Sequence, residues 1–351
     1  DPELFFERGG KVIGAEKVIP EEGLASGRWG NSKRTQIGEN LKAFVLDGVQ
    51  VELNPSPNTC RANLGNEIAA AMRTIKAHLA TMEGIEVSFR AVVQVDKEEL
   101  KSLSEKSRTL GCMPSFNMYD AEASIKVNPK TFRTRSAGGH IHLGFDRYPQ
   151  MMHERERLIP ILDILLGNTC VLIDRDPQAA ERRKVYGRAG EYRLPDHGIE
   201  YRTLSNFWLR AYPLLSMVTG ISTLAASVLY TSTVYKSMSA ENDLLSLVNP
   251  SEVAKAINTN NVELARRNYE KVKGFIKANW EYPYGIYASN IEQFDHFVHR
   301  IDEKGLDYWF PESPMEHWLA YREGHNTGFE HGLMLRVAKD MAQQSVEVPH
   351  V

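Results

Sequence analysis

The alternation in His140-Ile141-His142-Leu143 constrains this chain more than any other stretch. Side chains on a β-strand point alternately to its two faces, so the two histidines share one face and the two aliphatic residues share the other. Gly138 and Gly139 come just before and leave room for a close approach to the backbone. Neutral imidazole nitrogens bind metal ions, yet such a strand is equally compatible with an ordinary structural role. The stretch therefore predicts a strand and leaves its chemistry open.

Three further stretches share this design, with one apolar face and one face that carries acids, amides or an arginine. An ordinary solvent-facing strand would be expected to show lysine, threonine and serine at its polar positions. These strands show instead the groups that bind divalent cations and phosphate. The polar faces of the three strands carry Asp1 and Glu3; Gln50, Glu52 and Asn54; and Glu200 and Arg202. Placed in one sheet, the four strands would form a floor that holds divalent cations between carboxylates.

That set of groups suits phosphoryl transfer. Mg²⁺ prefers oxygen ligands and commonly bridges protein carboxylates to nucleotide phosphates. An arginine such as Arg202 would neutralise the phosphoryl oxygens by bidentate contact. Positioning and charge stabilisation do most of the catalysis in such reactions. No serine–histidine–acid arrangement suggests itself, because the two histidines share a strand with each other.

Composition and charge exclude several other classes. The chain is 42% hydrophobic and 25% charged, as in an ordinary soluble globular protein, and its net charge of −3 provides no basic surface for nucleic acid. Cys60, Cys112 and Cys170 are far apart and predict free thiols in a reducing compartment. The longest apolar tract, residues 213–235, is interrupted by hydroxyl residues and predicts a buried helix rather than a membrane span. With no visible signal peptide, we expect a cytoplasmic protein without nucleic-acid or membrane partners.

A hairpin is expected near the start of the chain. Residues 1–6 alternate, Gly9-Gly10 follows, and residues 11–14 return as a second strand. Because the sequence starts at Asp1, within this strand, we expect that residues originally preceded it. Residues 23–38 form a polar, glycine-rich loop that lacks the spacing of a P-loop. Lys33 in this loop is a candidate for phosphate contact, against the alternative of a solvated loop lysine.

Several segments show the apolar period of about 3.6 residues that is typical of an amphipathic helix. Two segments do not show this period. Residues 86–94 predict another strand. The basic segment 175–195 is interpreted either as a solvated loop or as an anion-binding lid. Helices are expected at residues 64–82, 97–107, 155–173, 212–235, 250–278 with a break at 258–261, 291–301 and 328–341.

Five motifs follow one another over about the first 210 residues: Asp-Pro-Glu-Leu-Phe-Phe, Val-Glu-Leu-Asn-Pro, Ala-Gly-Gly-His-Ile-His-Leu-Gly, Tyr-Gly-Arg-Ala-Gly-Glu-Tyr-Arg and Gly-Ile-Glu-Tyr-Arg-Thr-Leu-Ser-Asn-Phe-Trp. This series resembles the phage-type carboxylate–amine ligases, the type 2 group of the glutamine synthetase and glutamate–cysteine ligase superfamily. The resemblance implies an α+β fold with a glutamine synthetase-like, antiparallel, saddle-shaped β-sheet backed by helices. Residues 1–240 would form the catalytic domain, and residues 241–351 a helical C-terminal region packed on it.

The resemblance also implies a reaction. ATP and two or three Mg²⁺ ions, which Mn²⁺ could replace, would serve to convert a substrate carboxylate into an acyl phosphate. An amine would then displace phosphate to form an amide. The substrates would be small-molecule or peptide carboxylates and amines. Whether the protein forms a homo-oligomer is left open. The reaction would take place in the cytoplasm, that of the host if the protein is phage-encoded.

Carried over position by position, the resemblance implies roles for particular residues. The implied metal ligands are Glu3, Glu52, His140 and Glu200. The nucleotide contacts would be Arg188, Arg193 and Arg202, with Lys33 added from the glycine-rich loop. The substrate contacts would be His142, with Asn54 and Arg135 from the neighbouring polar positions. The catalytic set would be Arg202, His140 and Arg188.

Two other classes of function stay open. A metal-dependent hydrolase built on the His-x-His strand would need further ligands, for which His153 and His197 are available. A non-catalytic phage protein could retain the ligase fold as a binding or structural module. Nucleotide binding separates the ligase from both.

Overall fold

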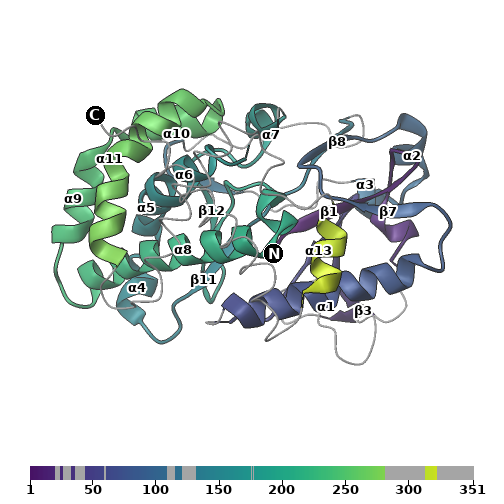
Figure 1. Ribbon diagram of the computed structural model, residues 1–351, viewed down its shortest axis with the longest axis horizontal. Helices are drawn as coiled ribbons and strands as arrows, with labels where there is room; N and C mark the ends of the chain where they lie inside the picture. Colours follow the sequence, from purple (N-terminus) through teal and green to yellow (C-terminus); the bar gives the residue numbers. More distant parts are fainter. Residues whose placement is uncertain are drawn as a thin grey trace, which may run out of the picture.

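The computed structural model describes residues 1–19, 44–58, 61–108, 115–120, 132–174, 176, 178–280 and 313–321, with the backbone alone at 24–26, 33–35, 213 and 277–280. Antiparallel sheets and helices combine in these residues as an α+β fold. Figure 1 shows the N-terminus near the middle of the molecule. To one side lie strands β1 (Glu3–Arg8) and β7 (Ile85–Ser88), and at the opposite end lie helices α9 (Ser239–Leu247), α10 (Pro250–Asn258) and α11 (Val262–Trp280).

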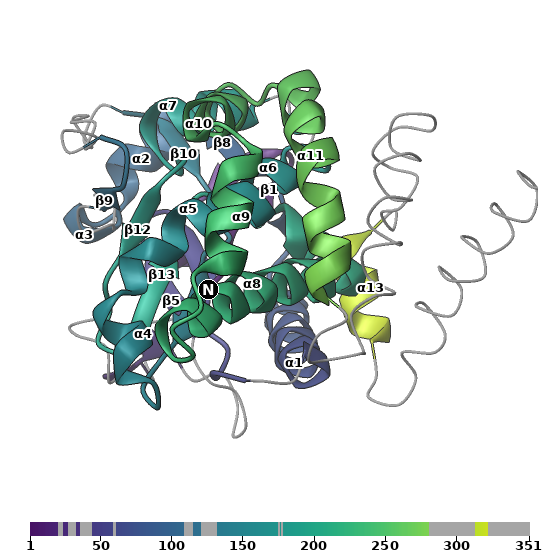
Figure 2. The same ribbon diagram turned by 90° about the vertical axis from the view of Figure 1, so that its left-hand side faces the viewer.

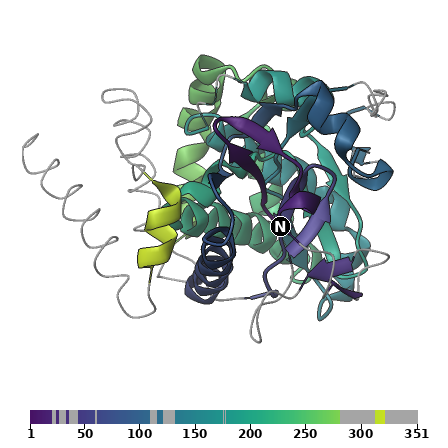
Figure 3. The same cartoon turned by 90° about the vertical axis from the view of Figure 1, so that its right-hand side faces the viewer.

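The larger sheet is organised around β1, which Figure 3 shows among the purple strands of the N-terminal region. All its pairings are antiparallel, and its other strands are β2 (Lys11–Ile13), β6 (Gln50–Leu53), β5 (Phe44–Asp47), β4 (Lys33–Thr35) and β3 (Leu24–Ser26). Gly9 and Gly10, between β1 and β2, have φ angles of +56° and +75°. A two-residue type I′ turn requires this left-handed pair, so the expected hairpin is confirmed.

The four polar-faced strands divide between two sheets, and the prediction that they share one sheet is wrong. β1 and β6 belong to the larger sheet, whereas β11 (Ile141–Gly144) and β13 (Gly198–Tyr201) belong to a second sheet with β12 (Glu191–Arg193) and β9 (Phe116–Asn117). Alternation along a strand determines which residues share a face, but it does not determine which strands pair. Two isolated bridges, Pro2 to Gly139 and Gly138 to Ser205, connect the sheets beside the site described below.

Residues 86–94 form two strands rather than the single strand expected. β7 pairs with β1, while β8 (Val92–Gln94) pairs with β10 (Thr134–Ser136) in a separate two-stranded ribbon. The chain therefore leaves the larger sheet after Ser88 and begins a new ladder at Val92.

One large hydrophobic core joins the helices to both sheets. Helix α8 (Tyr212–Thr233) packs against α1 (Arg61–Leu79), α5 (Leu158–Leu162) and α9. Figure 2 shows α9 and α11 side by side, with α8 crossing near them. The stretch Leu214–Thr233 is long and apolar enough to cross a membrane, but 67% of its most apolar window is buried inside the protein. The prediction of a buried helix at residues 213–235 is thus confirmed.

The longer helices agree with the expected positions, because strong periodicity over several turns is a reliable signal. α1 and α8 coincide with most of the segments 64–82 and 212–235, and α10 and α11 are separated at 259–261, as expected. Segment 155–173 is helical and contains a π-helical turn, η3 (Asp163–Gly167), between α5 and α6 (Asn168–Cys170). The segments 291–301 and 328–341, like Cys60 and Cys112, lie outside the described residues.

Two expectations about charged segments need correction. Residues 97–107 form two short helices, α2 (Lys97–Ser102) and α3 (Glu105–Arg108), rather than one. The basic segment 175–195 contains helix α7 (Ala179–Val185) and strand β12, so it is not a solvated loop. Arg182 explains the difference, because its buried guanidinium donates hydrogen bonds of 2.8 Å to the carbonyls of Thr203 and Leu204.

The remaining short elements are η1 (Ala15–Lys17), α4 (Pro149–His153), η2 (Arg155–Arg157), η4 (Asn206–Arg210) and α13 (Pro314–Ala320). Trp318 in α13 is fully buried and donates a 2.7 Å hydrogen bond to the carbonyl of Leu209. The domain boundary at residue 240 stays a prediction. Leu244, Val253 and Leu264, which follow it, belong to the same core as α5 and α8.

Candidate active site

Glu3, Asp47 and Glu52 form a group of three carboxylates in the larger sheet. The β1–β6 register places Glu3 directly opposite Glu52, and Asp47 comes from the end of β5. Each offers one oxygen, and these oxygens lie within 4.8 Å of one another. Oε2 of the fully buried Glu3 accepts hydrogen bonds from the backbone N–H of Gly138 (2.6 Å) and from Gln50 Nε2 (3.1 Å). Its Oε1 is buried and has no hydrogen-bond partner among the described residues.

The three carboxylates hinder one another's ionisation. Burial, followed by the charge of Asp47, raises the pKa of Glu3 to about 8 and that of Glu52 to about 7. Burial also raises the pKa of Asp47. Like charges in a confined space disfavour the ionised form, and a divalent cation between them would remove this penalty. The group therefore has the electrostatics of a cation site.

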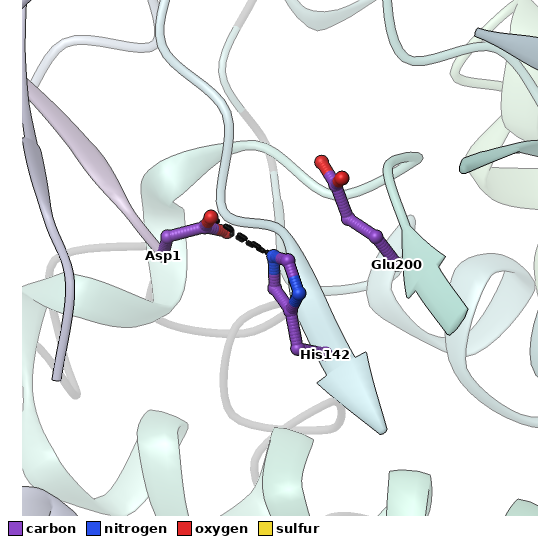
Figure 4. A group of neighbouring side chains, drawn as sticks. All are labelled: Asp1, His142 and Glu200. Carbon is purple, nitrogen blue, oxygen red and sulfur yellow. Dashed lines mark hydrogen bonds and ion pairs between the residues drawn. The ribbon is translucent and has the colours of Figure 1, made fainter. Parts of the chain in front are cut away.

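A second group of side chains lies in the other sheet. The β11–β13 register places His142 opposite Glu200, and Asp1 reaches the same place from the start of the chain. Figure 4 shows the three side chains pointing into one space from three segments, with Asp1 and His142 in contact. His142 Nε2 lies 2.9 Å from the Asp1 carboxylate. Two carboxylates and one imidazole are a ligand set that suits divalent metals.

His140 lies in the same place, just before β11, and is almost fully buried. Its Nδ1 is 3.3 Å from Glu200 Oε1 and 3.6 Å from Asp1 Oδ1. Burial, assisted by the charge of Arg202, lowers the pKa of His140 well below its usual range. Burial also lowers the pKa of His142 to about 3. Both imidazoles are therefore neutral at physiological pH, which is the form that binds metals.

Arg202 connects Glu200 to the rest of the site. It is fully buried, and its Nη1 contacts Glu200 Oε1 while its Nη2 donates a 2.7 Å hydrogen bond to the Tyr186 hydroxyl. Arg193 Nη1 lies 3.5 Å from Glu200 Oε2. Burial alone would raise the pKa of Glu200, but the charge of Arg202, assisted by that of Arg193, lowers it below its ordinary value. Glu200 therefore stays ionised.

The two groups belong to one site. Asp1 and Glu3, separated only by Pro2, supply one residue to each group. Glu200 raises the pKa of both Asp47 and Glu52 through its charge, which shows that the two groups influence each other electrostatically. The glycines at the bridge make this approach possible. A Cβ at Gly139 would lie 2.3 Å from the carbonyl oxygen of Ser205 and 2.3 Å from Trp208 Nε1.

The other expected site residues are placed less centrally. Asn54 Nδ2 is 3.4 Å from Glu52 Oε1, so Asn54 borders the first group. Arg188 Nη1 is 3.4 Å from Asp120 Oδ2, in the loop between α7 and β12. Arg135 is buried in β10 and donates to the backbone carbonyls of Phe132, Thr134 and Arg108, which favours a structural role over substrate contact. The backbone of Lys33 lies in β4, and its side chain is outside the described part of the structure.

Sequence reasoning gave Asp47 and Tyr186 no part in this site. It placed Asp1 on the polar face of the first strand without a specific role, and it named His197 only as a ligand for the hydrolase alternative. Asp47 had a usable signal, because Asp47-Gly48 begins a two-residue hairpin whose register places Asp47 opposite Gln50 and on the face of Glu52. His197 lies outside any strand, so alternation could not place it beside His142. Its Nε2 is 3.1 Å from His142 Nδ1, and the two rings stack with centroids 5.2 Å apart.

Comparison with known proteins agrees with this arrangement. Residues 118–303, more than half of the chain, match the family model described as phage phiEco32-like COOH.NH2 ligase-type 2. The matched region includes both histidines of the strand motif, Glu200 and the arginines around it. No curated protein and no solved structure matches the chain. The match over residues 118–303 shows that the chain belongs to the phage phiEco32-like family of carboxylate–amine ligases, type 2.

Proposed function

We propose that this carboxylate–amine ligase is ATP-dependent and forms an amide bond through an acyl-phosphate intermediate, with Mg²⁺ as the metal. One observation carries the proposal: two oxygen-rich groups of metal-binding side chains lie in one site beside the fully buried Arg202. Phosphoryl transfer from a nucleotide requires this combination of cation sites and a fixed positive charge. The glutamine synthetase-like saddle of the sheet is part of the same proposal.

The residues present fit divalent cations. Glu3, Asp47 and Glu52 would hold one ion, since Glu3 Oε1 is buried without a hydrogen-bond partner among the described residues and all three groups favour a positive neighbour. Glu200, with Asp1 and one of the histidines, would hold another. Bound Mg²⁺, or Mn²⁺ with the same ligands, would neutralise the nucleotide phosphates against these carboxylates. Two or three ions are consistent with the family's chemistry.

The reaction would proceed in two steps, phosphorylation of the carboxylate and then formation of the amide. A carboxylate oxygen of the substrate attacks the γ-phosphorus of ATP, and the bond to the bridging oxygen breaks to release ADP. Arg202 is positioned to stabilise the negative charge that spreads over the transferred phosphoryl oxygens. The amine nitrogen then attacks the acyl carbon, phosphate leaves, and the amine loses a proton. Arg188 and Arg193 would bind nucleotide phosphate or the substrate carboxylate, and His142 would face the substrate.

Isothermal titration of the purified protein with ATP and Mg²⁺ tests the proposal. We expect Mg²⁺-dependent nucleotide binding, followed by ADP release in a screen of amino acids, polyamines and peptides. A complete lack of nucleotide binding would refute the ligase mechanism. The screen also identifies the acid and the amine, because the specificity of pockets that would be built by loops cannot be read from the sequence.

The contact between His142 and His197 favours a second candidate, a metal-dependent hydrolase. Two imidazole nitrogens that lie 3.1 Å apart offer nitrogen ligands, which suit zinc better than magnesium. Metal analysis distinguishes the two candidates. Tightly bound zinc in a purified protein that does not bind ATP would support the hydrolase.

A further inference from the structure

Tyr186 contacts the two side chains on which the proposed phosphoryl transfer depends. It follows α7 directly, with extended backbone angles, and the next residue, Gly187, turns the chain with a φ of +70°. A Cβ at Gly187 would lie 2.1 Å from Arg182 Nη1, so only glycine allows this close turn. The turn directs the Tyr186 ring into the site, where the carbons of the Arg182 and Arg202 guanidinium groups lie 4.9 Å and 5.1 Å from its centroid.

The Tyr186 hydroxyl completes a closed ring of polar contacts. Arg202 donates through Nη2 to the Tyr186 hydroxyl at 2.7 Å and contacts Glu200 through Nη1. The Tyr186 hydroxyl in turn contacts His140 Nε2. His140 Nδ1 lies 3.3 Å from Glu200 Oε1, which closes the ring.

The donors and acceptors in this ring have one consistent assignment. Nδ1 of the neutral His140 faces the carboxylates of Glu200 and Asp1, which only accept hydrogen bonds when ionised, so Nδ1 carries the proton. Nε2 is then an acceptor and requires a donor. Arg202 only donates, so the Tyr186 oxygen accepts from Arg202 and donates its own hydrogen to His140.

We propose that Tyr186 is a positioning residue that holds the His140 ring and the Arg202 guanidinium in the arrangement required for phosphoryl transfer. This inference rests on the proposed function. Since Tyr186 occupies Nε2, His140 can meet a cation only through Nδ1, on the side of Glu200 and Asp1. If a cation bound Glu200, Arg202 would lose that partner, and its contact with Tyr186 would keep the guanidinium in place.

A tyrosine suits this position because a hydroxyl can both donate and accept. In the metal-free protein it donates to His140 Nε2, and with Nδ1 bound to a cation it would accept from a protonated Nε2. A carboxylate or a carbonyl could serve only the second state. Removing the hydroxyl would leave buried nitrogens of both His140 and Arg202 with one hydrogen bond fewer.

The test replaces Tyr186 by phenylalanine, which retains the ring. Tyr192→Phe is the matched control, because the Tyr192 hydroxyl bonds to Glu156 and not to His140 or Arg202. Loss of a partner that orients a metal ligand typically reduces activity about 10- to 100-fold. We expect kcat of Tyr186→Phe to fall by this factor while KM for ATP changes much less. The control should retain wild-type kcat. Wild-type kcat in Tyr186→Phe would overturn the proposal.

Nitrogen NMR of the metal-free full chain supplies a readout that does not depend on activity. The His140 signals are assigned by their loss in His140→Gln. We expect wild type to show a protonated Nδ1 and an unprotonated, hydrogen-bonded Nε2, and Tyr186→Phe to shift the Nε2 signal while Tyr192→Phe does not. A protonated Nε2 in the wild type, or an unchanged signal in Tyr186→Phe, would overturn the proposal. If wild type shows no ligase activity, the proposed function fails, but the wild-type signals still decide the role of Tyr186.

Discussion

Glu3 lies directly opposite Glu52 on adjacent antiparallel strands, and Asp47 brings a third carboxylate to within 4.8 Å of both. Burial, followed by the charge of Asp47, raises the pKa of Glu3 to about 8 and that of Glu52 to about 7. A carboxyl group whose pKa is raised by folding binds more protons in the native state than in the unfolded state. Its contribution to stability therefore decreases as pH rises from its ordinary value of 4.5 through the raised value.

The metal-free protein should therefore lose stability as Glu3 and Glu52 ionise. The lowered pKa values of His140 and His142 act in the opposite direction up to about pH 7.5, because these residues still bind protons in the unfolded chain, and the lowered pKa of the Asp1 amino group acts in that direction around pH 8. Between pH 6.5 and about 8.5, we therefore expect the forced ionisation of Glu3 and Glu52 to decrease the thermal unfolding midpoint relative to that of Glu3→Gln. Saturating Mg²⁺ should reduce the decrease. Thermal unfolding with and without chelator measures both effects.

Glu3→Gln is the control for this pH dependence. Glutamine cannot ionise and also relieves Glu52 of a negative neighbour, so the decrease between pH 6.5 and about 8.5 should be smaller in the variant. An equal decrease in wild type and Glu3→Gln would show that other groups cause it.

Removal of Glu200 or His140 should abolish activity. Glu200→Ala deletes a metal ligand and the partner of Arg202, and His140→Ala deletes its neighbour in the same group. We expect each to reduce ADP release at least about 100-fold while the protein stays folded, as judged by circular dichroism. Glu86→Ala, an exposed carboxylate on β7, should release ADP at the wild-type rate. Wild-type rates in either site variant would mean that the reaction occurs elsewhere.

Asp47 offers a test of the cation site that does not depend on turnover. Asp47→Asn keeps the shape of the side chain but removes one negative charge from the group with Glu3 and Glu52. Since loss of even an outer partner of a metal ligand costs about 10- to 100-fold in affinity, we expect Mg²⁺ to bind at least about tenfold more weakly. Calorimetric titration measures this, with Glu86→Gln as the charge-matched control. Unchanged affinity would remove Asp47 from the site.

Gly139 is predicted to be essential for the junction of the two sheets. A Cβ there would lie 2.3 Å from the carbonyl oxygen of Ser205, which is backbone and cannot rotate away. We expect Gly139→Ala to lower the free energy of unfolding by about 1–3 kcal/mol or more, as overpacking typically does. Chemical denaturation measures the change.

Gly274→Ala in α11 is the matched control, because its Cβ would meet no atom within 4 Å among the described residues. It should be neutral or stabilising by about 0.5–1 kcal/mol, since glycine within a helix is less stable than alanine. Equal destabilisation by both substitutions would contradict the steric explanation for Gly139.

Local patterns were sufficient for several features of this protein. The 3.6-residue period identified α1, the long apolar tract identified α8, and the break at 258–261 separated α10 from α11. Gly9-Gly10 identified the first hairpin. The assignment of 175–195 to a solvated loop failed because charge is a poor guide to exposure when arginines such as Arg182 bond to buried backbone carbonyls.

The sequence by itself determined which residues share a face of each strand, and its motifs indicated the ligase family to which the chain belongs. Only the tertiary structure decided that Glu3 pairs with Glu52 in one sheet and His142 with Glu200 in another. It also brought Tyr186 to His140, which precedes it by 46 residues. The physical reason is that alternation follows from the local geometry of a single strand. Strand partners, register and the junction of two sheets depend on contacts between residues far apart in the chain, and no local pattern encodes them.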